Sequence, residues 1–150
     1  MKNIFEKSIS EELIARINNL NTSSMPQWGK MNVNQMLAHC NVAYELTYEN
    51  KVSKPNWLKK MLLKTFVKPI VVGEKEYKRN SPTAPEFKII GTREFDKEKE
   101  RLIEYLKLTQ EKGALFFEGK VNHSFGVLTS NEWSNMFYKH LNHHLNQFGV

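Results

Sequence analysis

The chain has 150 residues and a single cysteine, Cys40. One cysteine excludes an intrachain disulfide and any zinc framework built from several cysteines. No hydrophobic run approaches the roughly 18 residues that a helix needs to cross a bilayer, and the first residues, MKNIFEKSIS, contain no apolar signal region. We therefore expect a cytoplasmic protein without a membrane span, folded as a single domain over residues 1–150.

Positive charge is concentrated in one segment of the chain. The net charge is +6, but residues 51–80 alone hold nine Lys or Arg and two Glu. Because the rest of the chain is close to neutral, we do not expect a nucleic-acid partner. The basic segment has three interpretations: the solvated face of an amphipathic helix, a lid that attracts anions, or a helix that lies on a membrane surface.

Hydrophobic residues recur in four long stretches at the spacing of an amphipathic helix. The alternation that is typical of strands is scarce, and a short strand is expected only near residues 87–90. The predicted fold class is therefore all-α, an up-and-down four-helix bundle. The long helices are expected at about residues 9–20, 32–49, 92–112 and 129–148.

The connection between the second and third long helices is unusually long. It should contain an extra short helix near residues 57–68 and then an irregular loop over residues 69–91. Loops of this length are commonly functional. Two helix ends carry strong signals: Thr129 and Glu132 have the spacing of a capping box, and Gly113 is predicted to end the third helix.

Three of the five histidines lie in the C-terminal stretch KHLNHHLNQFG. A helix advances about 100° per residue, so His140 and His144 share a stripe with Trp133 and face the core. By the same geometry His143 lies at the edge of that buried face. His39 lies on the apolar stripe of the second helix. The pattern therefore predicts three core-facing histidines on two helices.

Buried histidines need a chemical reason, because each imidazole must satisfy both of its ring nitrogens. His140 and His144 are one turn apart, about 6 Å along the axis, so both rings can reach one metal ion. His39 from a facing helix would complete a set of three ligands, which is typical of a catalytic metal site with an open position. The alternative is three hydrogen-bonded core histidines without a metal, and the spacing alone leaves both interpretations open.

Other kinds of site are less well supported by the sequence. Position 141 is Leu, so the HxxxH pattern lacks the Glu of a zinc-peptidase helix, and no Ser-His-Asp set, phosphate-binding loop or pair of carboxylates is evident. His123 is either a turn residue or a wall of the metal pocket. Cys40 points about 100° away from His39 on a helix, which predicts a packed side chain and not a ligand.

Two sequence blocks resemble the DinB-like superfamily of metal-binding four-helix bundles, and within it a subfamily of unknown function. The blocks are WGKMNVNQMLAHC around His39 and FGVLTSNEWSNMFYKHLNHHLNQFG near the C-terminus. The resemblance covers most of the chain and is weakest in the middle. It implies a divalent metal held by His39, His140 and His144, and Gln147 matches the tail of the family as a structural residue. We expect His143 and His123 to lie around this site as pocket residues, a role that the resemblance itself does not assign.

The resemblance also implies a range of functions. Some members of the superfamily are thiol-dependent transferases, others are described as metal-dependent hydrolases, and homodimers are frequent. We therefore expect a metal-dependent enzyme, a thiol S-transferase or a hydrolase, that acts on a small molecule such as a low-molecular-weight thiol. Zinc and nickel suit three imidazoles best, with iron and manganese as further candidates. The alternative is a non-catalytic, stress-related bundle that binds a metal or another ligand.

Overall fold

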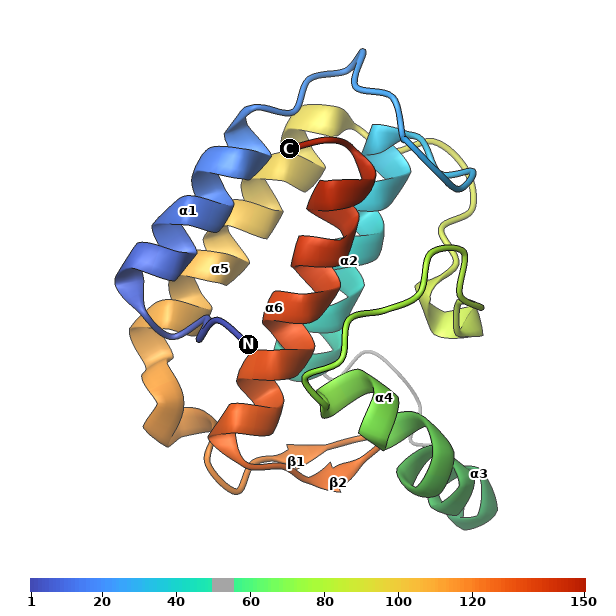
Figure 1. Cartoon of the computed structure of the whole chain (residues 1–150), viewed down its shortest axis with the longest axis vertical. Helices are drawn as coiled ribbons and strands as arrows, with labels where there is room; N and C mark the ends of the chain where they lie inside the picture. Colours follow the sequence, from blue (N-terminus) through green and yellow to red (C-terminus); the bar gives the residue numbers. More distant parts are fainter. Residues whose placement is uncertain (50–55) are drawn as a thin grey trace.

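The computed structural model describes residues 1–49 and 56–150, with the backbone alone at Lys59. Four long helices form the bundle and run roughly side by side (Figure 1). The predicted all-α fold, with an extra short helix and a long loop between the second and third long helices, is confirmed. The four helices are α1 (Lys7–Asn18), α2 (Val33–Tyr48), α5 (Phe95–Phe117) and α6 (Ser130–Gln147).

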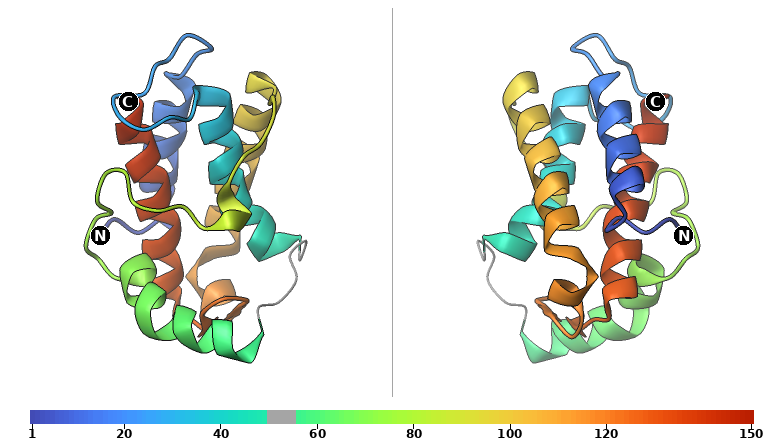
Figure 2. Two further views of the ribbon diagram at one scale, coloured as in Figure 1. Left: turned by 90° about the vertical axis from the view of Figure 1, so that its right-hand side faces the viewer. Right: turned by 90° about the vertical axis from the view of Figure 1, so that its left-hand side faces the viewer.

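The long connection between α2 and α5 determines the direction of the helices. It leaves the lower end of α2 and returns to the upper end of the bundle before α5 begins, so α2 and α5 run the same way (Figures 1 and 2). The bundle therefore runs up, down, down and up, and does not alternate strictly. As a result α6 runs opposite to α2, and the two histidine-bearing helices pack against each other.

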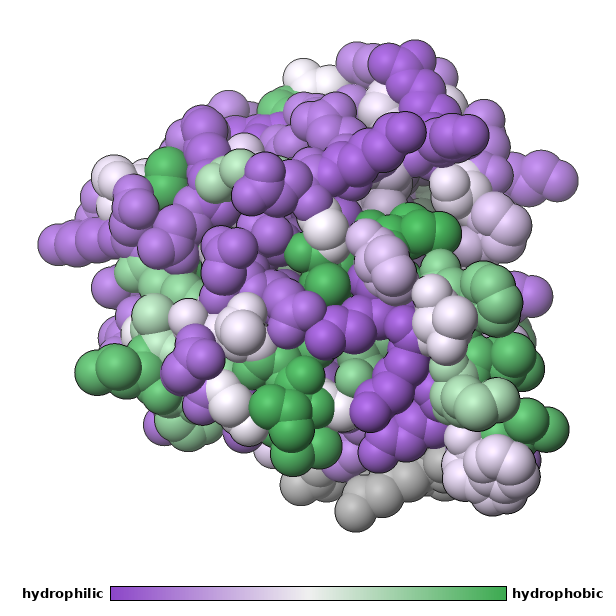
Figure 3. Space-filling model, turned by 60° about the horizontal axis from the view of Figure 1, so that its bottom comes forward, coloured by the Kyte–Doolittle hydropathy of each residue, from purple (hydrophilic) through white to green (hydrophobic). Residues whose placement is uncertain are grey.

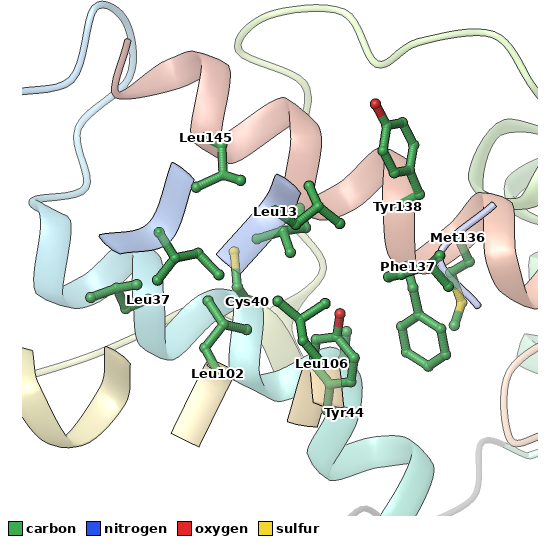
Figure 4. Packing of buried hydrophobic residues seen from close by; sticks show 14 of the residues in the cluster. Leu13, Leu37, Cys40, Tyr44, Leu102, Leu106, Met136, Phe137, Tyr138 and Leu145 are labelled. Carbon is green, nitrogen blue, oxygen red and sulfur yellow. The ribbon is translucent and has the colours of Figure 1, made fainter. Parts of the chain in front are cut away.

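The core lies between the four helices and is built from large apolar side chains. The Cys40 side chain lies among the leucines of several helices (Figure 4), and burial raises the pKa of its thiol. The prediction that Cys40 is a packed residue is therefore confirmed. Fully buried members of this core include Leu13 and Ile17 of α1, Met36, Leu37 and Tyr44 of α2, Leu102 and Leu106 of α5, and Trp133, Phe137 and Leu145 of α6.

Capping boxes fix the starts of both histidine-bearing helices. Thr129 Oγ1 accepts a hydrogen bond from the Glu132 N–H at 3.2 Å, and the Glu132 carboxylate accepts from the Thr129 N–H at 2.9 Å, as the sequence predicts. Asn32 and Gln35 form the equivalent pair at the start of α2. Because a capping box satisfies two otherwise unpaired backbone donors, it sets the residue at which the helix begins.

Gly113 ends the regular part of the third long helix, as the sequence predicts. It has a φ of 68°, which interrupts the helix with a kink, and α5 then continues to Phe117. The continuation is held by Phe117, which is fully buried and stacks on Phe5 with ring centroids 5.1 Å apart. Glycine adopts the backbone conformation of the kink without strain, and burial of the large Phe117 ring stabilises the turn that follows.

The arm (residues 57–72) is the extra helical element at the lower end of the bundle. It comprises α3 (Trp57–Leu62), the π-helical turn η1 (Leu63–Val67) and α4 (Lys68–Val72). Three side chains of α6 attach it. Lys139 Nζ donates to the carbonyl oxygens of Ile70, at 2.7 Å, and Gly73; Asn135 Nδ2 donates to the Val72 oxygen at 3.0 Å. Glu132 pairs with Lys68 at 2.8 Å.

The loop after the arm contains no strand, so the expected strand near residues 87–90 is wrong. Pro85 opens the short 3₁₀ helix η2 (Pro85–Phe87), which takes up the first of these residues, and residues 88–90 pair with no described strand. The only strands among the described residues form a small antiparallel hairpin between α5 and α6. They are β1 (Val121–Asn122) and β2 (Gly126–Val127), with Val121 opposite Val127.

Candidate metal centre

Three histidine rings meet between α2 and α6. The candidate ligand nitrogens of His39, His140 and His144 all lie within 4.8 Å of one another. The ring centroids are 4.9 Å apart for His39 and His140, 4.5 Å for His39 and His144, and 4.9 Å for His140 and His144. The three histidines that the sequence selected therefore form one cluster, to which the described residues bring no carboxylate or thiolate.

Helix geometry explains how the cluster forms. His140 and His144 are four residues apart on α6, so their rings project from adjacent turns of one face. His39 projects from the facing side of α2, whose start is fixed by the Asn32 capping box. His39 and His144 are buried, whereas His140 is partly exposed. A cluster with one partly exposed member can be approached from outside without moving a helix.

Hydrogen bonds determine which ring nitrogens face the centre of the cluster. His39 Nδ1 lies 2.8 Å from the Phe87 carbonyl oxygen, which can only accept, so Nδ1 carries the proton. His144 Nδ1 lies 2.8 Å from Gln147 Oε1 and must donate in the same way. In the neutral state, both rings therefore present the lone pair of Nε2, which is the form that binds a metal.

The position of His140 adds a second constraint. Its Nε2 lies 2.9 Å from His39 Nε2. Since His39 Nε2 carries a lone pair, the pair is stable only if His140 Nε2 carries a proton or if a cation lies between the two nitrogens. Ligand nitrogens of a tetrahedral zinc ion with bonds of about 2.0–2.1 Å lie roughly 3.3 Å apart. The His39–His140 pair therefore has to open by only a few tenths of an ångström to share a zinc ion, and the third nitrogen, that of His144, lies within 4.8 Å of both.

Gln147 links the cluster to the loop between α1 and α2. Its Nε2 donates to the Trp28 carbonyl oxygen at 2.6 Å, which leaves Oε1 as the acceptor for His144. The Gln147 backbone oxygen in turn accepts from the Gln27 N–H at 2.7 Å. Gly29 has a φ of 84°, and a Cβ there would lie 2.5 Å from Gln147 Nε2. The structural role expected of Gln147 is thus orientation of the His144 ring.

Sequence reasoning missed two parts of this arrangement. The spacing of three residues between His144 and Gln147 places both on one helix face, which was a readable signal for their hydrogen bond. The Phe87 carbonyl gave no signal, because a backbone acceptor in a long loop leaves no mark on residue type. Its position depends on how the loop packs back against α2.

Burial keeps the cluster neutral. It lowers the pKa of His39, although the bond to the Phe87 carbonyl acts in the opposite direction. Burial lowers the pKa of His144 to about 3, with a further contribution from His39. Burial, together with the neighbouring His39 and His144, holds the pKa of His140 well below the usual 6.5, although the residue as a whole is partly exposed. Neutral imidazoles are the state required for metal binding, so no net proton has to be released at neutral pH, although the proton on His140 Nε2 would move to Nδ1.

His143 and His123 lie outside the cluster, at its margins. His143 is half-buried and contacts three rings, those of Trp28 and Tyr77 at 5.7 Å and that of His144 at 5.2 Å. Burial lowers its pKa as well. His123, from the turn of the hairpin, lines the same cleft as the three clustered histidines. Both residues border the site, and neither reaches its centre.

The cluster lies in a cleft of about 1660 Å³. The arm, the 75–87 loop and the hairpin form the walls of the cleft. The long connection between α2 and α5, to which the arm and the loop belong, therefore encloses much of the space next to the histidines. Four lysines and two glutamates also line it, including Lys75 and Lys78 of the basic segment. Among the apolar lining residues are Leu46, Val67, Ile70, Phe87, Phe125 and Met136.

Comparisons with known proteins give one finding. No curated protein and no solved structure gives a significant match to the chain. A family model does match, and it covers residues 6–149, which include both histidine-bearing helices and the arm. The chain therefore belongs to the family described as "Protein of unknown function (DUF1569)".

Proposed function

We propose that this protein is a metal-dependent enzyme in which His39, His140 and His144 hold one divalent metal ion through their Nε2 atoms. The observation that carries the proposal is the pair of Nδ1 hydrogen bonds, from His39 to the Phe87 carbonyl and from His144 to Gln147. Partners of this kind orient metal-binding histidines and fix their tautomer. A purely structural histidine cluster has no need to direct its lone pairs at a common point.

Three neutral ligands leave part of the coordination sphere for a substrate. A divalent metal in such a site lowers the pKa of a bound water or thiol and so supplies a nucleophile at neutral pH. Gln147 holds the His144 ring in place, and His140 faces the cleft. The fitting reaction types are hydrolysis and thiol S-transfer. Zinc and nickel are the metals that we favour, ahead of iron and manganese, because imidazole ligands suit them.

The cleft favours a small-molecule substrate with an apolar body and an anionic group. Apolar side chains of the arm and the hairpin would contact the body. Lys75 and Lys78 at the wall would attract the anionic group, since charged clefts raise the local concentration of an oppositely charged ligand. A low-molecular-weight thiol with a carboxylate has this combination of properties. We also assign the chain to the DinB-like superfamily, on its two histidine-containing sequence blocks and its helical bundle.

The test is to load the metal-free protein separately with zinc, nickel, ferrous iron and manganese. Each form is then assayed for conjugation of a low-molecular-weight thiol to an electrophile and for ester hydrolysis. We expect turnover by at least one form and its loss in His144→Ala. Metal binding at the three histidines without turnover in any form would contradict the enzyme and identify a non-catalytic metal-binding bundle. Cobalt spectra that show no exchangeable position would support that second outcome.

A further inference from the structure

Exposed hydrophobic side chains are concentrated at one end of the molecule. Among the described residues fourteen large hydrophobic side chains are exposed; seven of them belong to the arm and four to residues 115–127. Four of these eleven also border the cleft: Val67, Ile70, Phe116 and Val121. Figure 3 shows this end, where hydrophobic groups extend across the face from the end of α5 to α3 with hydrophilic groups among them. The set includes Trp57, Met61 and Phe66 of the arm, and Leu115, Val121 and Val127 near the hairpin.

The arm is oriented with its apolar side outward. Lys68 faces the body of the protein and pairs with Glu132 at 2.8 Å. Lys64 is exposed, and its Nζ extends along the hairpin, 2.9 Å from the position of a Cβ on Gly126. Trp57 is 76% exposed and Phe66 is 66% exposed. The arm therefore exposes large apolar side chains as well as lysines, and an exposed apolar patch of this kind marks an interaction surface.

Positive charge accompanies the exposed hydrophobic groups. The Nζ atoms of Lys112 and Lys120 lie 5.0 Å and 4.6 Å from the centroid of the Phe116 ring. None of the described carboxylates pairs with Lys60, Lys64, Lys112 or Lys120. The carboxylates of residues 113–132 are engaged elsewhere: Glu118 accepts from the Ser130 N–H at 2.8 Å, and Glu132 pairs with Lys68.

We propose that this end of the protein docks on an anionic membrane surface. Its combination of exposed aromatic and aliphatic side chains with unpaired lysines is the chemistry of an interfacial helix on acidic lipid. No described helix is both long and apolar enough to cross a bilayer, so the contact is peripheral. A two-fold contact between two copies fits less well, because it would bring the same lysines of both copies together.

Vesicle sedimentation with the full chain tests the proposal. We expect co-sedimentation with vesicles of phosphatidylcholine and phosphatidylglycerol at low salt, and little with phosphatidylcholine alone. Leu58→Ser combined with Phe66→Ser should weaken binding at least about tenfold, because two exposed apolar groups are lost without a change of charge. Lys112→Gln and Lys120→Gln should each weaken it about fivefold. Met25→Ser combined with Ile90→Ser is the matched control, since both side chains are exposed away from this end.

Three outcomes would overturn the proposal, provided that the variants are folded. All of the substituted side chains except that of Lys120 are exposed, and Lys120 is partly exposed, so the variants should keep the thermal stability of the parent, which is checked first. Absence of vesicle binding at low salt, or equal weakening by the control, overturns the proposal. A dimer in light scattering that Leu58→Ser with Phe66→Ser dissociates, without vesicle binding, also overturns it and assigns the surface to a second copy.

Discussion

The Nε2 atoms of His39 and His140 lie 2.9 Å apart, although the two residues are separated by 101 positions in the chain. His39 projects from α2 and His140 from α6, and the two helices pack against each other. Since His39 directs a lone pair at His140, the contact needs either a proton or a metal ion between the nitrogens.

Gln147→Met should weaken metal binding by about 10–100-fold, because the His144 ring loses the acceptor that fixes its tautomer. The measurement is the dissociation constant for zinc, by competition with a chelator. Asn146→Met is the matched control: Asn146 is exposed, and its side chain accepts a bond from Arg16 on the far side of α6. Equal affinities of the two variants would show that Gln147 has no part in the site.

Gly29→Ala should destabilise the fold and disturb the metal site together. The substitution places a Cβ 2.5 Å from Gln147 Nε2 at a φ of 84°, so strain and displacement of Gln147 both follow. Gly91→Ala has nearly the same φ, 82°, but its Cβ meets nothing within 4 Å. It should cost only the backbone strain, about 1–2 kcal/mol. Urea unfolding and zinc affinity of both variants separate the two effects; a normal zinc affinity in Gly29→Ala contradicts the prediction.

The metal-free protein should lose stability as the pH falls below the usual histidine pKa of 6.5. His144 has a folded pKa of about 3, so between these values the unfolded chain binds a proton that the folded chain does not. The free energy of unfolding therefore falls with decreasing pH, by up to about 1.4 kcal/mol per pH unit for this residue. Above pH 6.5 the contribution is constant. The measurement is urea unfolding with a chelator at about pH 7 and about pH 5.

The same pH experiment on His144→Gln provides the comparison. Glutamine does not titrate, so the stability of this variant should depend less steeply on pH over that range. His39 and His140, whose pKa values are also lowered, keep part of the dependence in the variant. Identical pH dependence in the two proteins would mean that His144 is protonated normally in the folded state.

Lys139→Met should loosen the arm without unfolding the bundle. The substitution leaves the Ile70 and Gly73 carbonyl groups without the ammonium that now bonds to both, at a cost of about 1–3 kcal/mol. Hydrogen exchange should quicken in residues 63–73 and stay unchanged in α1. Lys107→Met is the control, since Lys107 is exposed on α5. Uniform quickening along the whole chain would instead indicate global destabilisation.

Much of the fold and of the cluster was predictable from local sequence. Apolar spacing located the four long helices, and the Thr129–Glu132 pair located the start of α6. The step of about 100° per residue separated His140 and His144 from His143, and the structure places His143 beside the cluster and not within it. These features depend on residues that are close in the chain, so the sequence carries them directly.

The features that were not predicted depend on tertiary packing. After Gly113 the chain makes one further helical turn, because the buried Phe117 holds that turn in place. The outward orientation of the arm is set by Lys139 and Glu132 of α6, about 70 residues further along the chain. The Phe87 carbonyl reaches His39 only because the loop packs on α2. Residue type alone contains no trace of such contacts.

The metal content of the purified chain shows directly whether His39, His140 and His144 bind one metal ion together. Wild type, His39→Ala, His140→Ala, His144→Ala and the control His123→Gln are each loaded with excess zinc, freed of unbound metal and measured by elemental analysis. The account predicts one zinc per chain in the wild type and the control, and none in the three alanine variants that remain folded. Zinc retained by all three alanine variants, or no zinc in the wild type, would contradict it.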